Sequence, residues 1–89
     1  MDSIIEMKEE ELKKYSAKMT IDNFLNSIGV DISKWYFVEA NLLEWDNKPI
    51  SLNICYHNNK IKDVSFILDL RCFEEEWEII DFSISYDSI

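Results

Sequence analysis

The chain has 89 residues, of which 18 are acidic and 9 are basic, and its formal net charge at neutral pH is −9. This length predicts one domain, residues 1–89, with a thin hydrophobic core and no second domain. The negative charge repels nucleic acid and anionic membranes, so we expect no direct nucleic-acid contact and a basic protein partner.

The N-terminal residues contain no basic segment followed by an apolar run, and no stretch approaches the length needed to cross a bilayer. We therefore expect a cytoplasmic protein with no membrane partner. In that compartment Cys55 and Cys72 are expected to be reduced thiols.

Helices are predicted over residues 3–29. Ser3 followed by Glu6 matches the capping box of a helix start. A second short helix is expected to begin at Thr20 and to end at Gly29, a residue that favours the left-handed conformation after a helix. The alternative is one helix with a kink near Thr20. At helical spacing, these apolar residues are expected to face the core: Ile5, Leu12, Tyr15, Met19, Ile21, Phe24, Leu25 and Ile28.

An antiparallel sheet of four strands is predicted over residues 35–87. β-Branched and aromatic residues recur with period two in four runs, and turn residues separate these runs. The even-numbered positions are apolar, so the even-numbered face is predicted to pack on the helices. Three-residue loops at 58–60 and 74–76 would keep that face aligned between strands. The expected fold class is α+β, with N-terminal helices on one face of a four-stranded meander.

A helix followed by a meander that ends in Trp77-Glu78-Ile79-Ile80-Asp81-Phe82 resembles a cystatin-like or NTF2-like curved sheet. This resemblance concerns the fold, because one fold serves many functions. It leaves open a small-molecule-binding domain as an alternative. Such a pocket needs polar groups on the inner face, which is almost wholly aliphatic and aromatic in this chain.

Most of the negative charge lies in the last third of the chain, where residues 63–89 carry eight acids and one arginine. The predicted register places Asp69 opposite Asp81 and Asp63 opposite Asp87. Like charges across an antiparallel pair are destabilising by up to about 1 kcal/mol. A cation from another molecule would relieve this repulsion and form charge-assisted hydrogen bonds. A register shift of two residues, or acids that turn into water, are the alternatives.

Aromatic residues are predicted on the outward, odd-numbered face of the first strand of this sheet. Trp35 and Trp45 would then serve as apolar anchors beside the acids, as at many protein interfaces. Two alternatives remain open: residues 30–34 or the curvature of the sheet cover these side chains, or the aromatic strand forms a homodimer. We expect a monomer or a weak homodimer.

No catalytic residue, metal site or cofactor site is predicted. His57 is the only histidine and lies beside a turn without a recognisable nucleophile. Cys55 lies two residues before it, but Cys72 points inward by parity, so no zinc site is completed. Paired acids without a cleft are a weak sign of catalysis, and the single glycine excludes a phosphate loop. We expect a protein that is not an enzyme.

In length, acidity and an outward sheet face with Asp69, Asp81, Ser83, Ser85 and Asp87, the chain resembles the small immunity proteins with which bacteria neutralise nuclease toxins of the colicin and contact-dependent inhibition kinds. The resemblance implies occlusion of a basic toxin domain with nuclease activity. The alternative is a phage-encoded inhibitor that mimics nucleic acid in a host defence enzyme. The predicted partner-binding residues are Asp63, Asp69, Asp81, Asp87, Glu74, Glu75, Glu76, Glu78, Trp35 and Trp45.

Overall fold

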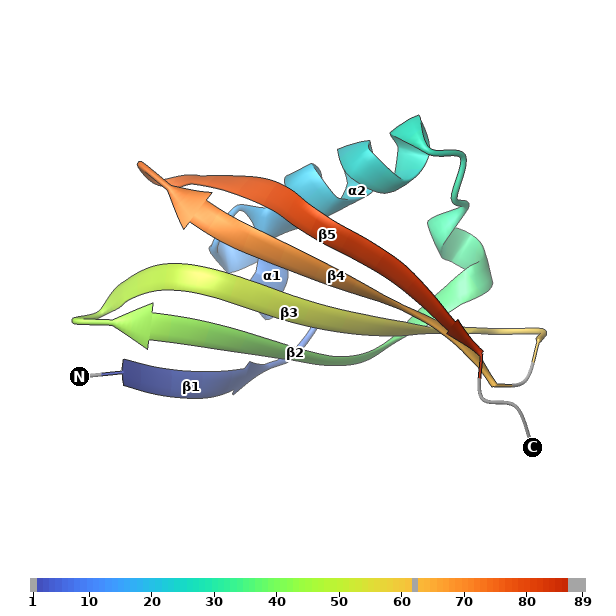
Figure 1. The fold of residues 1–89 in the computed structure, drawn as a ribbon, viewed down its shortest axis with the longest axis horizontal. Helices are drawn as coiled ribbons and strands as arrows, with labels where there is room; N and C mark the ends of the chain where they lie inside the picture. Colours follow the sequence, from blue (N-terminus) through green and yellow to red (C-terminus); the bar gives the residue numbers. More distant parts are fainter. Residues whose placement is uncertain (1, 62, 87–89) are drawn as a thin grey trace.

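The protein has an α+β fold in which two short helices cover one face of a five-stranded antiparallel sheet (Figure 1). The computed structural model describes residues 2–61 and 63–86. The strands follow one another across the sheet in chain order, as a meander. The elements are β1 Asp2–Met7, α1 Glu11–Lys14, α2 Ala17–Ser27, the 3-10 helix η1 Ile32–Lys34, β2 Trp35–Trp45, β3 Lys48–Asn58, β4 Val64–Phe73 and β5 Glu76–Tyr86.

The chain begins with a strand where a helix was predicted. β1 pairs antiparallel with β2, so the sheet has five strands and the predicted capping box at Ser3 and Glu6 is wrong. Met7 is buried opposite Ala40 in this pair. Pairing gives the β1 backbone hydrogen-bond partners and buries Met7, and this tertiary gain outweighs a local helix signal.

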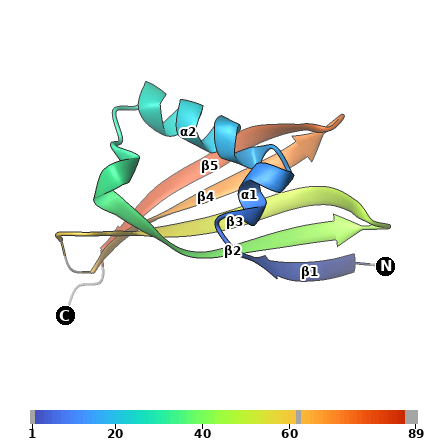
Figure 2. The same ribbon diagram turned by 180° about the vertical axis from the view of Figure 1, so that it is seen from behind.

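The helical layer begins at Glu11 instead of Ser3. There the Glu11 Oε1 atom accepts a hydrogen bond from the backbone N–H of Lys8 at 3.0 Å, which is the acidic half of a capping box. The two helices separate at Ser16, whose φ of 63° is left-handed, and not at the predicted Thr20. Figure 2 shows α1 and α2 on the same side of the sheet.

The buried face of the helices differs in part from the predicted stripe. Leu12, Ile21 and Leu25 are buried as predicted, whereas Met19 and Ile28 are exposed. The break at Ser16 rotates α2 relative to α1, so the stripe of α1 does not continue through Met19.

The left-handed residue predicted after the helix is confirmed at Gly29, whose φ is 79°. The N–H of Val30 donates to the Leu25 carbonyl at 2.9 Å, and the N–H of Gly29 donates to the Asn26 carbonyl at 3.2 Å. This is the Schellman arrangement, which satisfies free carbonyls at a helix end. Val30 then packs against the core and leads the chain back toward the sheet.

The even-numbered face of the sheet is the inner face, as predicted, across its centre. The buried residues there are Ala40, Leu42, Leu52, Ile54, Tyr56, Val64, Phe66, Leu68 and Leu70. Three register shifts break this parity. In the pairing of β2 with β3 they lie between Phe37 and Glu39 and between Leu43 and Glu44, and in the pairing of β4 with β5 the shift lies opposite Asp69 and Leu70. A bulge adds one residue to one strand and so exchanges the two faces beyond it.

The loops differ from the predicted three-residue loops. Residues 59–63 connect β3 to β4, and this odd-length connection preserves the predicted even register. Glu74 and Glu75 alone form the β4–β5 turn, which shifts the register by one residue. The bulge at Ile80 then restores even pairing for the rest of β5.

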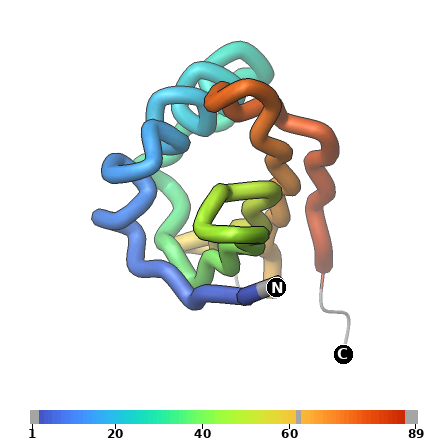
Figure 3. The backbone as a smooth tube through the Cα atoms, turned by 90° about the vertical axis from the view of Figure 1, so that its left-hand side faces the viewer, coloured from blue at the N-terminus to red at the C-terminus, as the bar shows by residue number. Residues whose placement is uncertain are grey.

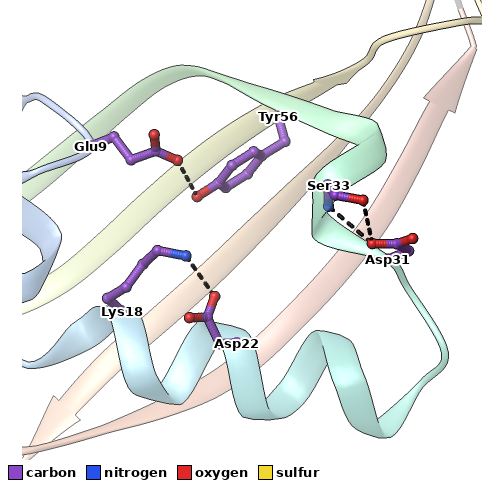
Figure 4. A network of polar contacts seen from close by, with 6 residues as sticks. All are labelled: Glu9, Lys18, Asp22, Asp31, Ser33 and Tyr56. Atoms are coloured by element: carbon purple, nitrogen blue, oxygen red, sulfur yellow. Dashed lines mark hydrogen bonds and ion pairs between the residues drawn. The ribbon is translucent and has the colours of Figure 1, made fainter.

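Polar contacts at the edge of the core join the helical layer to the sheet. The Trp77 Nε1–H group donates to the Tyr15 carbonyl at 2.8 Å. The Tyr56 hydroxyl donates to Glu9 Oε2 at 3.3 Å, as Figure 4 shows. Burial, together with the Glu9 charge, raises the pKa of Tyr56 well above its ordinary value. No helix in the described part of the chain is long and apolar enough to cross a bilayer.

The connection between α2 and β2 has its own cap. The Asp31 Oδ1 atom accepts hydrogen bonds from the backbone N–H of Ser33 at 3.1 Å and from its hydroxyl at 2.7 Å (Figure 4). These bonds lower the pKa of Asp31 because they favour its charged form. The cap stabilises η1 just before Trp35 enters the sheet.

Candidate partner-binding surface

The sheet face away from the helices, called the outer face here, carries a polar row that crosses all five strands. The pairing register places one residue of each strand in this row: Glu6, Asn41, Asn53, Asp69 and Asp81. Glu6 and Asp81 are exposed at its two ends, and the three residues between them are half-buried. Strands β4 and β5 therefore bring two carboxylates together at one end of the row.

The predicted pairing of Asp69 with Asp81 is confirmed. Asn53 Nδ2 donates to Asp69 Oδ1 at 2.5 Å, so one oxygen of this pair has a donor within the protein. Among the side chains that the structure describes, Lys18 and Asp22 form the only ion pair within 4.0 Å (Figure 4). The Asp69–Asp81 pair thus has no cation at contact distance among the described residues.

The bulge in β5 brings Ile80 to the outer face, although parity predicted it in the core. Asp69 faces Asp81 and Leu70 faces Ile79, so Ile80 between them has no opposite residue. Ile80 is 48% exposed and lines a hollow of about 440 Å³ on this face. Sequence alternation alone does not show a bulge, so this apolar residue was missed.

The hollow has an apolar and a charged side. Ile4 and Leu43, which face each other across β1 and β2, line it together with Ile80. Asp69 and Arg71 of β4 complete its polar wall. Ile4 is 74% exposed and was also missed, because its segment was assigned to a helix. An apolar side chain flanked by polar or charged groups fits this combination of groups.

The β4–β5 turn holds two acids in an unfavourable backbone conformation. Glu74 and Glu75 have φ values of 48° and 69°, where Asn and Gly are the preferred residues of two-residue hairpins. The β2–β3 turn, Asp46 and Asn47, has the same left-handed pair of φ values but suitable residues. Glu-Glu is destabilising at this turn, and such strain often accompanies a functional constraint.

The remaining acids of β5 are exposed, but one has a basic neighbour. Glu76 lies opposite Phe73 at the start of the strand, and Glu78 lies opposite Arg71 on the outer face. Arg71 was the one base of the C-terminal third, and it is placed beside Glu78 and not beside Asp81. Glu78 is therefore a weaker candidate for an external cation than Asp81.

The two tryptophans predicted as anchors lie in different environments. Trp35 is on the inner face and packs against Phe66, with ring centroids 4.7 Å apart, so its prediction as an outward anchor is wrong. Phe37 also points inward, against Tyr56. The bulge near Val38 reverses the faces of this part of β2. Trp45 lies beyond it, next to the β2–β3 turn, and is 52% exposed.

Of the predicted pair Asp63 and Asp87, Asp87 lies outside the described residues. Asp63 is half-buried directly before β4, with a φ of 67°, and the pairing of β4 with β5 begins only at Val64 and Tyr86.

The surface has no recognisable catalytic or metal-binding arrangement in the part of the chain that is described. No group of three potential metal ligands occurs among those residues. His57 lies against the Tyr36 ring, with centroids 5.5 Å apart. Cys55 faces Glu39, and burial followed by the Glu39 charge raises the pKa of its thiol, which disfavours the reactive thiolate. Both cysteines are free, and Cys72 packs against the core.

Comparisons with known proteins found no relative of this chain. No family model, no curated protein and no solved structure matches the chain.

Proposed function

We propose that this chain is an acidic immunity protein. It binds a basic toxin domain with nuclease activity and neutralises that domain by covering its surface. The acids of β4, β5 and their turn steer the partner, and the hollow beside Ile80 receives an apolar side chain. This proposal rests on charge, geometry and a resemblance of type, and it assigns no catalytic role to the chain.

The observation that carries the proposal is the Asp69–Asp81 pair, which faces the outer surface without a cation of residues 2–61 and 63–86 within 4.0 Å. Folding alone disfavours like charges in opposite positions. A Lys or Arg side chain from a partner would convert this repulsion into charge-assisted hydrogen bonds. The strained Glu74–Glu75 turn supports the same reading, because it keeps negative charge where Asn-Gly would fold better.

The test starts from the product of the neighbouring reading frame, expressed with and without this chain in the same host. We expect growth arrest by that product alone and rescue by this chain. Association of the two purified proteins should slow about tenfold or more as NaCl rises from about 0.05 M to about 0.5 M, because salt screens long-range steering. An association rate that does not change with NaCl concentration would contradict electrostatic steering by these acids.

Matched charge reversals locate the surface. Asp81→Lys should weaken the complex by at least about 30-fold, because it places a cation where the partner's cation binds. Glu10→Lys makes the same charge change on the helical layer, where Glu10 is exposed and makes no capping hydrogen bond. Equal losses from both changes would assign the effect to net charge and not to the outer face.

The nucleic-acid mimic uses the same acids against a different target. In that case the complex with a host defence enzyme should be displaced by DNA or RNA that occupies the same groove. An immunity protein bound beside its toxin's active site tolerates bound nucleic acid. A complex that persists in the presence of a labelled duplex, measured by fluorescence anisotropy, would therefore exclude the nucleic-acid mimic.

A further inference from the structure

The last strand, β5, is an edge of the sheet. β4 pairs with one side of β5 over residues 76–86, and no further strand of the described chain pairs with the other side. Figure 3 shows this strand along one side of the molecule, with α2 above it and not beyond its free edge. Alternate N–H and C=O groups of an edge strand point away from the sheet and are free to pair with another chain.

The second half of β5 lacks the features that protect exposed edges. Residues 82–86 contain no charge, no proline and no bulge, and their sequence, FSISY, favours β-structure. Ile84 is 45% exposed and Tyr86 is 71% exposed. The opposite edge, β1, is only six residues long and includes the exposed Glu6. The unprotected edge is therefore confined to one strand.

We infer that the free edge of β5, over residues 81–86, binds an extended strand of the basic partner and continues the sheet by one strand. The expectation that this partner is positively charged rests on the proposed function. The location of the site rests on the geometry of the edge. Main-chain hydrogen bonds give such strand addition its affinity, and alternate side chains give it specificity.

The two faces of β5 define the side chains that fit on the added strand. Asp81, Ser83 and Ser85 lie on the outer face, so the residues beside them should be basic or small and polar. Phe82 packs against the core, and Ile84 lies opposite the buried Phe66, so the residues beside these two should be apolar. The partner strand should therefore alternate basic and apolar residues.

A second copy of this chain fits the edge less well. In its described part β5 carries Glu76, Glu78 and Asp81 and no basic residue, and the whole chain has a net charge of −9. Self-pairing would bring only like charges to the new interface, whereas a basic strand is complementary in charge.

The probe for this site is a capped peptide of about seven residues that alternates lysine and valine. Its controls are a peptide that alternates glutamate and valine and one with the lysines and valines in separate blocks. Each peptide is titrated into the isotope-labelled protein, and its binding is followed by the NMR chemical shifts of the backbone amides. We expect the alternating lysine peptide to shift and protect from exchange the amides of residues 81–86, and to bind at least about tenfold more tightly than either control.

Two proline substitutions test the backbone. In an antiparallel pair, the N–H groups of successive residues point to opposite sides of a strand, so Ser83→Pro and Ile84→Pro remove donors from opposite sides. The substitution that removes the β4-facing donor should lower Tm strongly. The other should keep a Tm close to that of the wild type, because proline is tolerated on an edge, and should abolish peptide binding.

The outcomes separate this site from the proposed function. The lysine peptide could shift only amides of the outer face and bind equally well to the edge-proline variant. That result would overturn the edge site and leave the electrostatic proposal standing. Equal binding of the lysine and glutamate peptides would retain strand addition but overturn the basic partner. The absence of peptide binding at millimolar concentration, or a dimer in light scattering that the edge proline dissociates, would overturn the inference.

Discussion

Asp69 of β4 and Asp81 of β5 lie directly opposite each other in an antiparallel pair, and the side chain of Asn53 donates a hydrogen bond to Asp69. The Asp81 carboxylate has no side-chain hydrogen bond or ion pair among the described residues. The protein therefore carries an electrostatic repulsion on its surface that one neutral substitution at Asp81 would remove.

Asp81→Asn should raise the free energy of unfolding by up to about 1 kcal/mol at low salt, because it removes the like-charge pair without changing side-chain size. Urea denaturation at low and high NaCl measures this gain, which should shrink as salt screens the charges. Glu39→Gln is the matched control, since Glu39 faces the neutral Cys55. An equal gain from the control would attribute the effect to net charge alone.

Replacing Glu74-Glu75 by Asn-Gly should stabilise the protein by about 1 kcal/mol or more, because these residues adopt the observed left-handed pair of φ values with little strain. The same variant should associate more slowly with the basic partner, because it loses two steering charges. Thermal unfolding and stopped-flow association measure the two effects. A gain in stability with unchanged association would remove the turn from the proposed surface.

The two tryptophans should respond differently to truncation. Trp35→Ala should lower the free energy of unfolding by about 3 kcal/mol, because the Trp35 ring packs edge-on against the buried Phe66. Trp45→Ala should change it by no more than about 0.5 kcal/mol, because half of that side chain is exposed. Urea unfolding of both variants checks the reversal of faces in β2; similar losses would contradict it.

Tyr56→Phe should lower the free energy of unfolding by about 1 kcal/mol at neutral pH, because the variant lacks the hydrogen bond to Glu9. The folded-state pKa of Tyr56 is raised, so the protonated hydroxyl stabilises the fold below the unfolded pKa of about 10, and this stabilisation is lost as pH rises beyond it. The advantage of the wild type should therefore shrink above about pH 10. Tyr36→Phe, at an exposed site, serves as the control in the same unfolding series.

Gly29→Ala should cost about 1 kcal/mol of stability, because alanine at a φ of 79° is strained. A Cβ atom at this position meets no atom within 4 Å, so the loss reports the backbone alone. Gly29→Asn should cost less, since asparagine tolerates the left-handed region. Equal losses in thermal unfolding of the two variants would indicate a steric cause instead.

Local patterns in the sequence predicted several features that the structure confirms. Period-two alternation identified the inner face at the centre of the sheet, because successive side chains of a strand point to opposite faces. Alternation and a three-residue loop at 74–76 predicted Asp69 opposite Asp81. The structure has this pairing, but it reaches it through a two-residue turn whose register shift is compensated by the bulge at Ile80. The glycine that ends α2 was equally visible, because only the left-handed conformation closes that helix end.

The strand β1 and the register shifts of the sheet were decided by tertiary structure. β1 forms because Met7 becomes buried beside β2, a contact with residues more than thirty positions away that no local motif records. The bulge near Val38 turns Trp35 inward, and the bulge at Ile80 brings an isoleucine to the outer face. Alternation in sequence assigns a side chain to one of two faces only while the register is unbroken, and the register depends on how whole strands pack.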